Sequence, residues 1–158
     1  MNYFGRTLSA AGLGGLATLL SLAAAKAETT TICDQKIEYT LSPAAPGLPS
    51  EISGFAGRWQ GMITYQPMVE MCNGFVFEKV DANGAVGQRA WSAGAGSGIV
   101  GVNSMGVVAY GGKFDGNILR TTSPDGKNVW EIRMTGPNEI SGFFTRQGNR
   151  YPVWAKRK

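Results

Sequence analysis

The sequence contains no histidine, the side chain that most often serves as a general base or as a zinc ligand. Without it, a serine or cysteine nucleophile lacks its usual base, and two cysteines alone do not make a zinc site. Carboxylate pairs such as Glu78 with Asp81, or Glu131 with Glu139, have the chemistry for glycoside cleavage, but solvent-facing acids on strands and turns explain them more simply. We therefore expect neither an enzyme nor a protein with a metal or another cofactor.

Charge is also sparse, and this argues against a nucleic acid partner. Residues 1–27 have the features of an export signal: Arg6 precedes an uncharged run from residue 8 to residue 25, and Ala25-Lys26-Ala27 offers small residues to a signal peptidase. Cleavage after Ala27 leaves 13 basic and 11 acidic residues. The resulting net charge of +2 is too low to favour nucleic acid.

An uncleaved membrane anchor is the alternative for residues 1–27, because the uncharged run is long enough to cross a bilayer. Its glycines, serines and threonines make it weakly apolar, so a cleaved signal is the better interpretation. We expect a periplasmic or secreted protein without stable membrane insertion after cleavage. Its mature part is expected to have an N-terminal arm and proline-rich linker over residues 28–54 and one domain over residues 55–158.

Cysteine occurs only twice, as Cys33 and Cys72, and both lie outside the expected signal. An oxidising compartment favours one disulfide between them. This disulfide closes a loop with a sequence separation of 39 residues, for which the chain-entropy model gives about 4 kcal/mol of stabilisation. It would tie the N-terminal arm to the domain, across the stiff connector that three prolines create over residues 42–50.

The sequence also lacks any helix of length, because its 23 glycines and 7 prolines interrupt every candidate. Alternating apolar and polar residues separated by turn signals instead predict eight strands, and residues 28–41 could supply one more short strand. Tight turns between consecutive strands favour an up-and-down order, which closes into an all-β, eight-stranded antiparallel barrel. The eight ranges are 57–65, 73–80, 85–92, 106–114, 117–122, 128–135, 139–146 and 150–157.

The start of the first of these strands carries a family resemblance. Gly57-Arg58-Trp59 resembles the Gly-x-Trp motif of the calycins, the small barrels that include lipocalins and avidins. The resemblance covers about residues 55–157 and implies a structural role for Trp59, with a basic residue of the last strand, Arg157 or Lys156, stacking on its indole. The Asn and Ser that bind biotin in avidins have no counterpart in residues 60–64, so biotin binding is not implied.

Aromatic residues on several predicted strands could converge inside such a barrel. A filled core is the plainer interpretation, since small barrels normally pack solid. The alternative is an apolar pocket, with space left beside the rings by Gly87, Gly111, Gly112 and Gly142. The aromatic residues are Trp91, Tyr110, Phe114, Trp130 and Phe144.

Two functions fit these patterns. The first is a binding protein that holds a small apolar or sugar-like ligand in or at the mouth of the barrel, near the glycine-rich residues 94–101. For this function we predict Trp91, Tyr110, Trp130 and Phe144 as ligand-binding residues. The second is a protein-binding module, such as an inhibitor of an exported hydrolase, with the terminus Glu28–Ile32 as its candidate contact.

Overall fold

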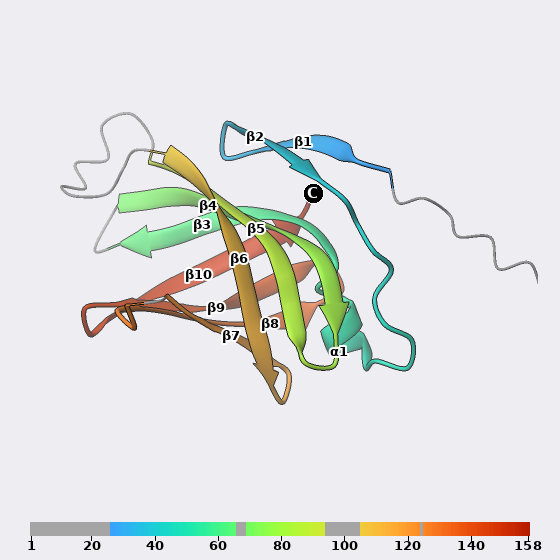
Figure 1. The fold of residues 1–158 in the computed structure, drawn as a ribbon. Coiled ribbons are helices and arrows are strands. Elements are labelled where there is room, and N and C mark those ends of the chain that lie inside the picture. The colour runs from blue at the N-terminus through green and yellow to red at the C-terminus, as the bar shows by residue number, and fades with distance from the viewer. Residues whose placement is uncertain (1–25, 66–68, 94–104, 124) are drawn as a thin grey trace, which may run out of the picture.

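Eight antiparallel strands close into one barrel in the computed structural model, which describes residues 26–65, 69–93, 105–123 and 125–158 (Figure 1). The predicted fold class, an all-β eight-stranded antiparallel barrel, is therefore confirmed. Most of the expected signal at residues 1–27, and the glycine-rich residues 94–101, lie outside the described residues.

Each barrel strand pairs with the next one along the chain, and β10 returns to β3 to complete the wall. The predicted strand bounds agree with the observed ones to within one residue at most ends. The main difference is β4, which begins at Val69 rather than residue 73 and carries a bulge between Phe77 and Lys79. The barrel strands are β3 (Gly57–Tyr65), β4 (Val69–Asp81), β5 (Gly84–Ala93), β6 (Met105–Asp115), β7 (Ile118–Thr122), β8 (Asn128–Gly136), β9 (Glu139–Arg146) and β10 (Asn149–Arg157).

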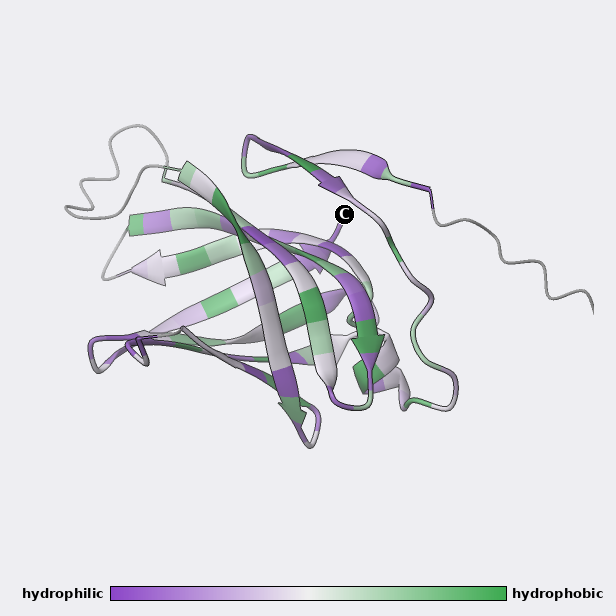
Figure 2. Ribbon diagram, in the orientation of Figure 1, coloured by the Kyte–Doolittle hydropathy of each residue, from purple (hydrophilic) through white to green (hydrophobic). Residues whose placement is uncertain are grey.

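Hydrophobic and hydrophilic residues interleave along these strands, as Figure 2 shows by colour. In β3, the buried residues Trp59, Gly61 and Ile63 alternate with partly exposed neighbours. Because side chains alternate with a period of two along a strand, one set points into the barrel and the other set points outward. The inner set forms one large apolar cluster that runs through the barrel.

The N-terminal arm forms a hairpin of β1 (Glu28–Ile32) and β2 (Gln35–Tyr39). The sequence predicted one short strand here, whereas the structure has two. Cys33 and Asp34 adopt φ values of 50° and 61° and reverse the chain between them. The hairpin lies against the outside of the barrel wall (Figure 1), where Ile32, Ile37 and Tyr39 form a second apolar cluster with Val76 and Ala90. The arm therefore covers a part of the wall that would otherwise expose apolar side chains.

The predicted disulfide joins this hairpin to β4. Cys33 and Cys72 are bonded, with their Cα atoms 5.5 Å apart. Cys72 lies opposite Met62 where β3 and β4 pair, and the side chains of both residues point out of the barrel. The disulfide thus fixes the hairpin to the outer face without entering the barrel.

A single helical turn, α1 (Ser50–Ser53), follows the proline-rich connector and lies at one end of the barrel (Figure 1). The next residues place Phe55 inside the barrel, fully buried, where its ring contacts Phe77 and Phe114 edge-on. The helix end of the barrel is thereby closed by packed side chains.

Candidate functional site

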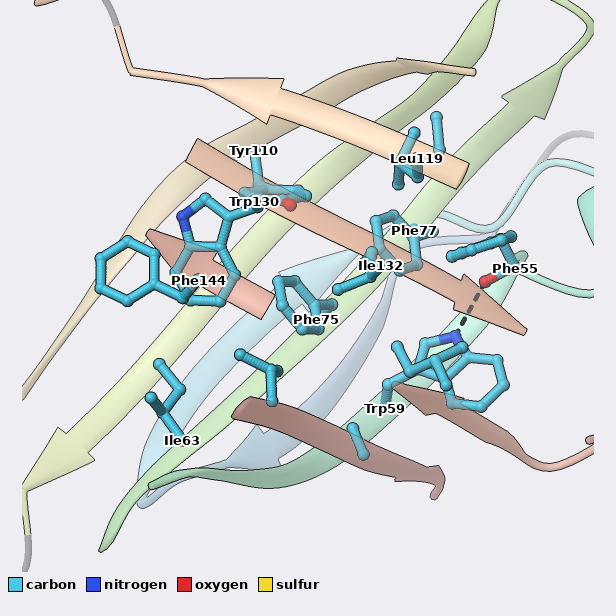
Figure 3. Packing of buried hydrophobic residues seen from close by; sticks show 14 of the residues in the cluster. Phe55, Trp59, Ile63, Phe75, Phe77, Tyr110, Leu119, Trp130, Ile132 and Phe144 are labelled. Atoms are coloured by element: carbon cyan, nitrogen blue, oxygen red, sulfur yellow. Dashed lines mark hydrogen bonds between the residues drawn. The ribbon is translucent and has the colours of Figure 1, made fainter. Parts of the chain in front are cut away.

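Trp59 and Arg157 complete the closed end of the barrel. The Trp59 indole is fully buried, and its Nε1 donates a hydrogen bond of 2.8 Å to the carbonyl oxygen of Phe55 (Figure 3). The Arg157 guanidinium lies 4.4 Å from the centre of the indole and donates to the carbonyl oxygens of Ala56 and Gly54, at 2.8 and 2.6 Å. The stacking expected on Trp59 is thus made by Arg157 and not by Lys156.

Further along the interior the barrel is solid. Phe75 and Phe77, inward neighbours on β4, are both fully buried, with ring centres 5.5 Å apart and an interplanar angle of 9°. Figure 3 shows these rings between Trp59 at the closed end and Trp130 and Phe144 beyond. A filled core is therefore the correct description of the half of the barrel nearest α1.

The other half contains a cavity of about 560 Å³. It lies where β3, β5 and β9 end, since Tyr65, Trp91 and Arg146 line it, away from Trp59 and Phe55. The four predicted ligand-binding residues, Trp91, Tyr110, Trp130 and Phe144, all line this cavity. The interior is thus filled at one end and hollow at the other, so each of the two interpretations from the sequence describes one half.

Three of these four rings form a nearly rigid group. Trp130 stacks on Phe144 with ring centres 4.3 Å apart, and Tyr110 meets Trp130 edge-on at 6.2 Å. Tyr110, Trp130 and Phe144 keep 7%, 5% and 6% of their surface exposed. Phe114, grouped with them from the sequence, lies instead at the closed end, where its ring is 5.4 Å from that of Phe55.

The fourth ring, Trp91, lies over the backbone of β6. A Cβ atom on Gly106 would come within 2.5 Å of Cζ2 of the Trp91 indole. The absence of a side chain at Gly106 therefore makes room for this indole at the cavity.

The glycines expected to leave space beside the rings act differently. Only Gly111 lines the cavity. At Gly87 and Gly142 a Cβ atom would come within 1.8 Å of a carbonyl oxygen of the neighbouring strand, and at Gly112 within 2.4 Å of Thr121 Oγ1. These three glycines permit close contact between strands and do not create the cavity.

The cavity also contains an arginine that the sequence reasoning missed. Arg89 shares the inward face of β5 with Trp91, and its Nε donates a hydrogen bond of 2.7 Å to Asn73 Oδ1. Its guanidinium carbon lies 4.2 Å from the centre of the Trp130 ring and 4.9 Å from that of Trp91. Desolvation lowers the pKa of Arg89 to about 10, so the side chain remains a cation at neutral pH. Arg89 precedes Trp91 by two residues on one strand, and this spacing could have predicted that both side chains point into the barrel.

Several polar atoms at or next to the cavity are buried without a hydrogen bond of good geometry among the described residues, although Thr121 interacts with the Tyr110 hydroxyl. They are Tyr110 Oη, Thr121 Oγ1 and Asn73 Nδ2. Burial raises the pKa of Tyr110, and in the same way that of Tyr65, so both phenols stay neutral at pH 7. The cavity thus combines aromatic surface with a cation and uncommitted polar groups.

The cavity reaches the side of the barrel between β6 and β7. These strands pair only over Lys113–Asp115 and Ile118–Arg120, which leaves the first part of β6 without a partner strand on that side among the described residues. Val108 points inward on β6 yet keeps 44% of its surface exposed, because it faces the cavity. The cavity is therefore open to solvent on this side of the barrel.

Within the described ranges, no group of three or more His, Cys, Asp or Glu side chains could hold a metal ion. None of the helices in that part of the chain is long and apolar enough to cross a membrane. Comparisons of the chain with protein-family models, curated proteins and solved structures found no match.

Proposed function

We propose that the chain is an exported binding protein without enzymatic activity, which holds one small apolar or sugar-like ligand in the hollow half of its barrel. The observation that carries this proposal is the cavity of about 560 Å³, lined by Trp91, Tyr110, Trp130 and Phe144. Its volume lies in the range of small-molecule sites, roughly 300–1,000 Å³. Aromatic rings supply apolar contact area at little cost in side-chain entropy.

The arrangement of the barrel supports a pocket in one half only. The layer from Trp59 to Phe77 is fully buried and fixed by ring packing, so it supplies stability without offering space. The rings of Trp130 and Phe144 rest on this layer through Phe75, which meets Trp130 edge-on at 5.8 Å. A ligand would therefore meet a surface whose shape is set before binding, which limits the entropy lost on association.

A calycin-like assignment belongs to the same proposal. It rests on the closed barrel of eight strands and on the stacking of Arg157 over Trp59. A periplasmic or secreted location is likewise supported by the Cys33–Cys72 disulfide, a bond that persists in oxidising compartments.

The test is a ligand screen read by tryptophan fluorescence, with lipids, haem-like molecules and oligosaccharides as the classes tried. At least one compound should quench the wild-type signal with saturable, single-site behaviour and should bind more weakly to Trp91→Ala. Trp154→Ala is the matched control, because Trp154 points out of β10 with 39% of its surface exposed. A screen in which no compound binds, or in which both variants lose affinity equally, would overturn the proposal.

A protein-binding role, such as inhibition of an exported hydrolase, remains the alternative. The terminus considered for that role, Glu28–Ile32, is paired with β2, and the side chains of Thr30 and Ile32 are buried. A terminus held in this way does not protrude toward a partner. We therefore rank ligand binding first.

A further inference from the structure

The charge inside the cavity narrows the class of ligand. Arg89 and Arg146 both line the cavity, and no aspartate or glutamate does so among the described residues. All 11 acidic residues of the chain lie within the described ranges, since the segments 1–25, 66–68, 94–104 and 124 contain none. None of these acids forms an ion pair with Arg89 in the part of the chain that the structure describes.

Arg89 makes few polar contacts for a half-buried cation. A guanidinium carries five N–H donors, and Arg89 uses Nε for Asn73 Oδ1, the one acceptor that it reaches among the described residues. Its guanidinium carbon lies 4.2 Å from the centre of the Trp130 ring and 4.9 Å from that of Trp91. The terminal N–H groups of Arg89 donate no hydrogen bond to the described residues, so they can receive a planar acid group in bidentate fashion.

The protein itself offers no compensating negative charge nearby. Tyr65 and Tyr110 face Arg89 across the cavity, and burial raises the pKa of each, so neither becomes a phenolate at neutral pH. A cation partly removed from water without a counter-charge is costly, and an apolar side chain at the same place would avoid that cost. The presence of Arg89 is accounted for if the counter-charge arrives with the ligand.

Three buried polar atoms reinforce this interpretation. Tyr110 Oη, Thr121 Oγ1 and Asn73 Nδ2 have no hydrogen-bond partner within the described residues, and all three can donate to an oxygen. Tyr110 and Thr121 also line the cavity, and Asn73 is tied to it through Arg89. Asn73 and Tyr110 are thus neighbours of Arg89, and Thr121 is a neighbour of Tyr110, so these donors can serve the oxygens of an acid group bound at Arg89.

We propose that the ligand is an organic anion, in which an apolar or aromatic body carries one acid group that Arg89 binds inside the barrel. The body lies against Trp91, Trp130 and Phe144, and the acid group meets the terminal N–H groups of Arg89. This inference rests on the proposed ligand-binding function and adds the charge of the ligand to it.

Two fluorescent probes of matched shape test the charge directly. 1-Anilinonaphthalene-8-sulfonate is N-phenyl-1-naphthylamine with one added sulfonate, so the difference between their dissociation constants isolates the contribution of the anion. Wild-type protein should bind the sulfonate at least about tenfold more tightly, and Arg89→Met should reduce this preference to less than about threefold while affinity for the neutral probe is kept. Near-UV circular dichroism and a stoichiometry of one probe per chain show that the fold is intact.

Arg133→Met is the control variant, because it makes the same chemical change on the exposed face of β8. It should leave both dissociation constants unchanged. Arg89→Lys keeps the charge but not the planar fork, so it should retain part of the preference for the sulfonate. If Arg89→Met does not fold, the wild-type protein and Arg89→Lys decide the question.

The outcomes separate this inference from the proposed function. If wild-type protein binds both probes equally well, or if Arg89→Met keeps the full preference for the sulfonate, the anion inference is overturned and the cavity remains a site for neutral ligands. If neither probe binds to wild-type protein, the proposed function fails and this inference fails with it.

Discussion

Trp59 shows how one residue can determine the closed end of the barrel. Its indole is fully buried, hydrogen-bonded to Phe55 and covered by the guanidinium of Arg157. Burial lowers the pKa of Arg157, and its two hydrogen bonds to backbone carbonyls offset part of that desolvation. The role was predictable because Gly-x-Trp at a strand start and a base at the final strand are both visible in the sequence.

Replacement of Trp59 by alanine should lower the free energy of unfolding by about 3–5 kcal/mol, the usual cost of removing a buried large aromatic side chain. Urea denaturation of the variant beside Trp154→Ala gives the comparison, since Trp154 is 39% exposed on the outer face. Equal stability of the two variants would contradict a structural role for Trp59.

Tyr110 gives a prediction about alkaline pH. Because burial raises its pKa above the ordinary value of 10.0, the folded protein keeps a proton that the unfolded chain releases. Its contribution to stability is therefore constant below about pH 10 and falls as the pH rises further. Tyr110→Phe should lose less stability than wild type between about pH 9 and about pH 11, measured by urea denaturation.

At pH 7 the same variant should be at least as stable as wild type, because the Tyr110 hydroxyl is buried without a partner among the described residues. Tyr39 and Tyr65 also titrate in the alkaline range, but they are common to both proteins and do not depend on Tyr110, so they cancel in the comparison. Parallel pH curves for the two proteins would show that Tyr110 is not the group responsible.

Among the elements, the β1–β2 hairpin depends most on a covalent bond. It packs on the outside of β4 and β5 through a small cluster, and the Cys33–Cys72 disulfide cross-links it to the wall in addition to the chain that leads on to β3. The pairing was predictable from two cysteines in an exported chain, but the hairpin was not, because Cys33 in a left-handed conformation is an unusual turn residue. Local propensity therefore did not reveal the turn.

The double variant Cys33→Ser/Cys72→Ser should lose about 4 kcal/mol of stability. Hydrogen exchange should speed up most in β1 and β2, and the barrel strands should remain protected under native conditions. Uniform acceleration throughout the barrel would contradict the view of the hairpin as a separately attached cover.

The contacts between strands place strict demands on some glycines. Gly87→Ala should lower stability by more than about 2 kcal/mol, because its Cβ would lie 1.8 Å from the Val76 carbonyl oxygen. Gly136→Ala is the control, since the nearest atom to its Cβ, on Glu139, is 3.9 Å away. Denaturation curves that coincide for the two variants would contradict the close approach of β4 and β5 at Gly87.

At the scale of the whole molecule, the sequence predicted the barrel well because alternation and turn residues are local signals. The cavity depends instead on where side chains from β3, β5, β6, β8 and β9 end up relative to one another. Trp91, Tyr110, Trp130 and Phe144 were grouped because they lie on predicted strands whose inner faces could converge. Arg89 lies on the same face of its strand as Trp91, but an arginine that points into a barrel runs against the ordinary expectation that charges face water.

The central claim is tested most directly by the affinity of N-phenyl-1-naphthylamine for two variants in which neighbouring valines of β6 are replaced by tryptophan, Val107→Trp and Val108→Trp. Val108 faces the cavity with 44% of its surface exposed, whereas Val107, 38% exposed, points outward. If the hollow half of the barrel is the ligand site, Val108→Trp fills it and weakens binding by at least about tenfold, while Val107→Trp binds like wild type. Equal affinity in the two variants would show that the ligand binds elsewhere.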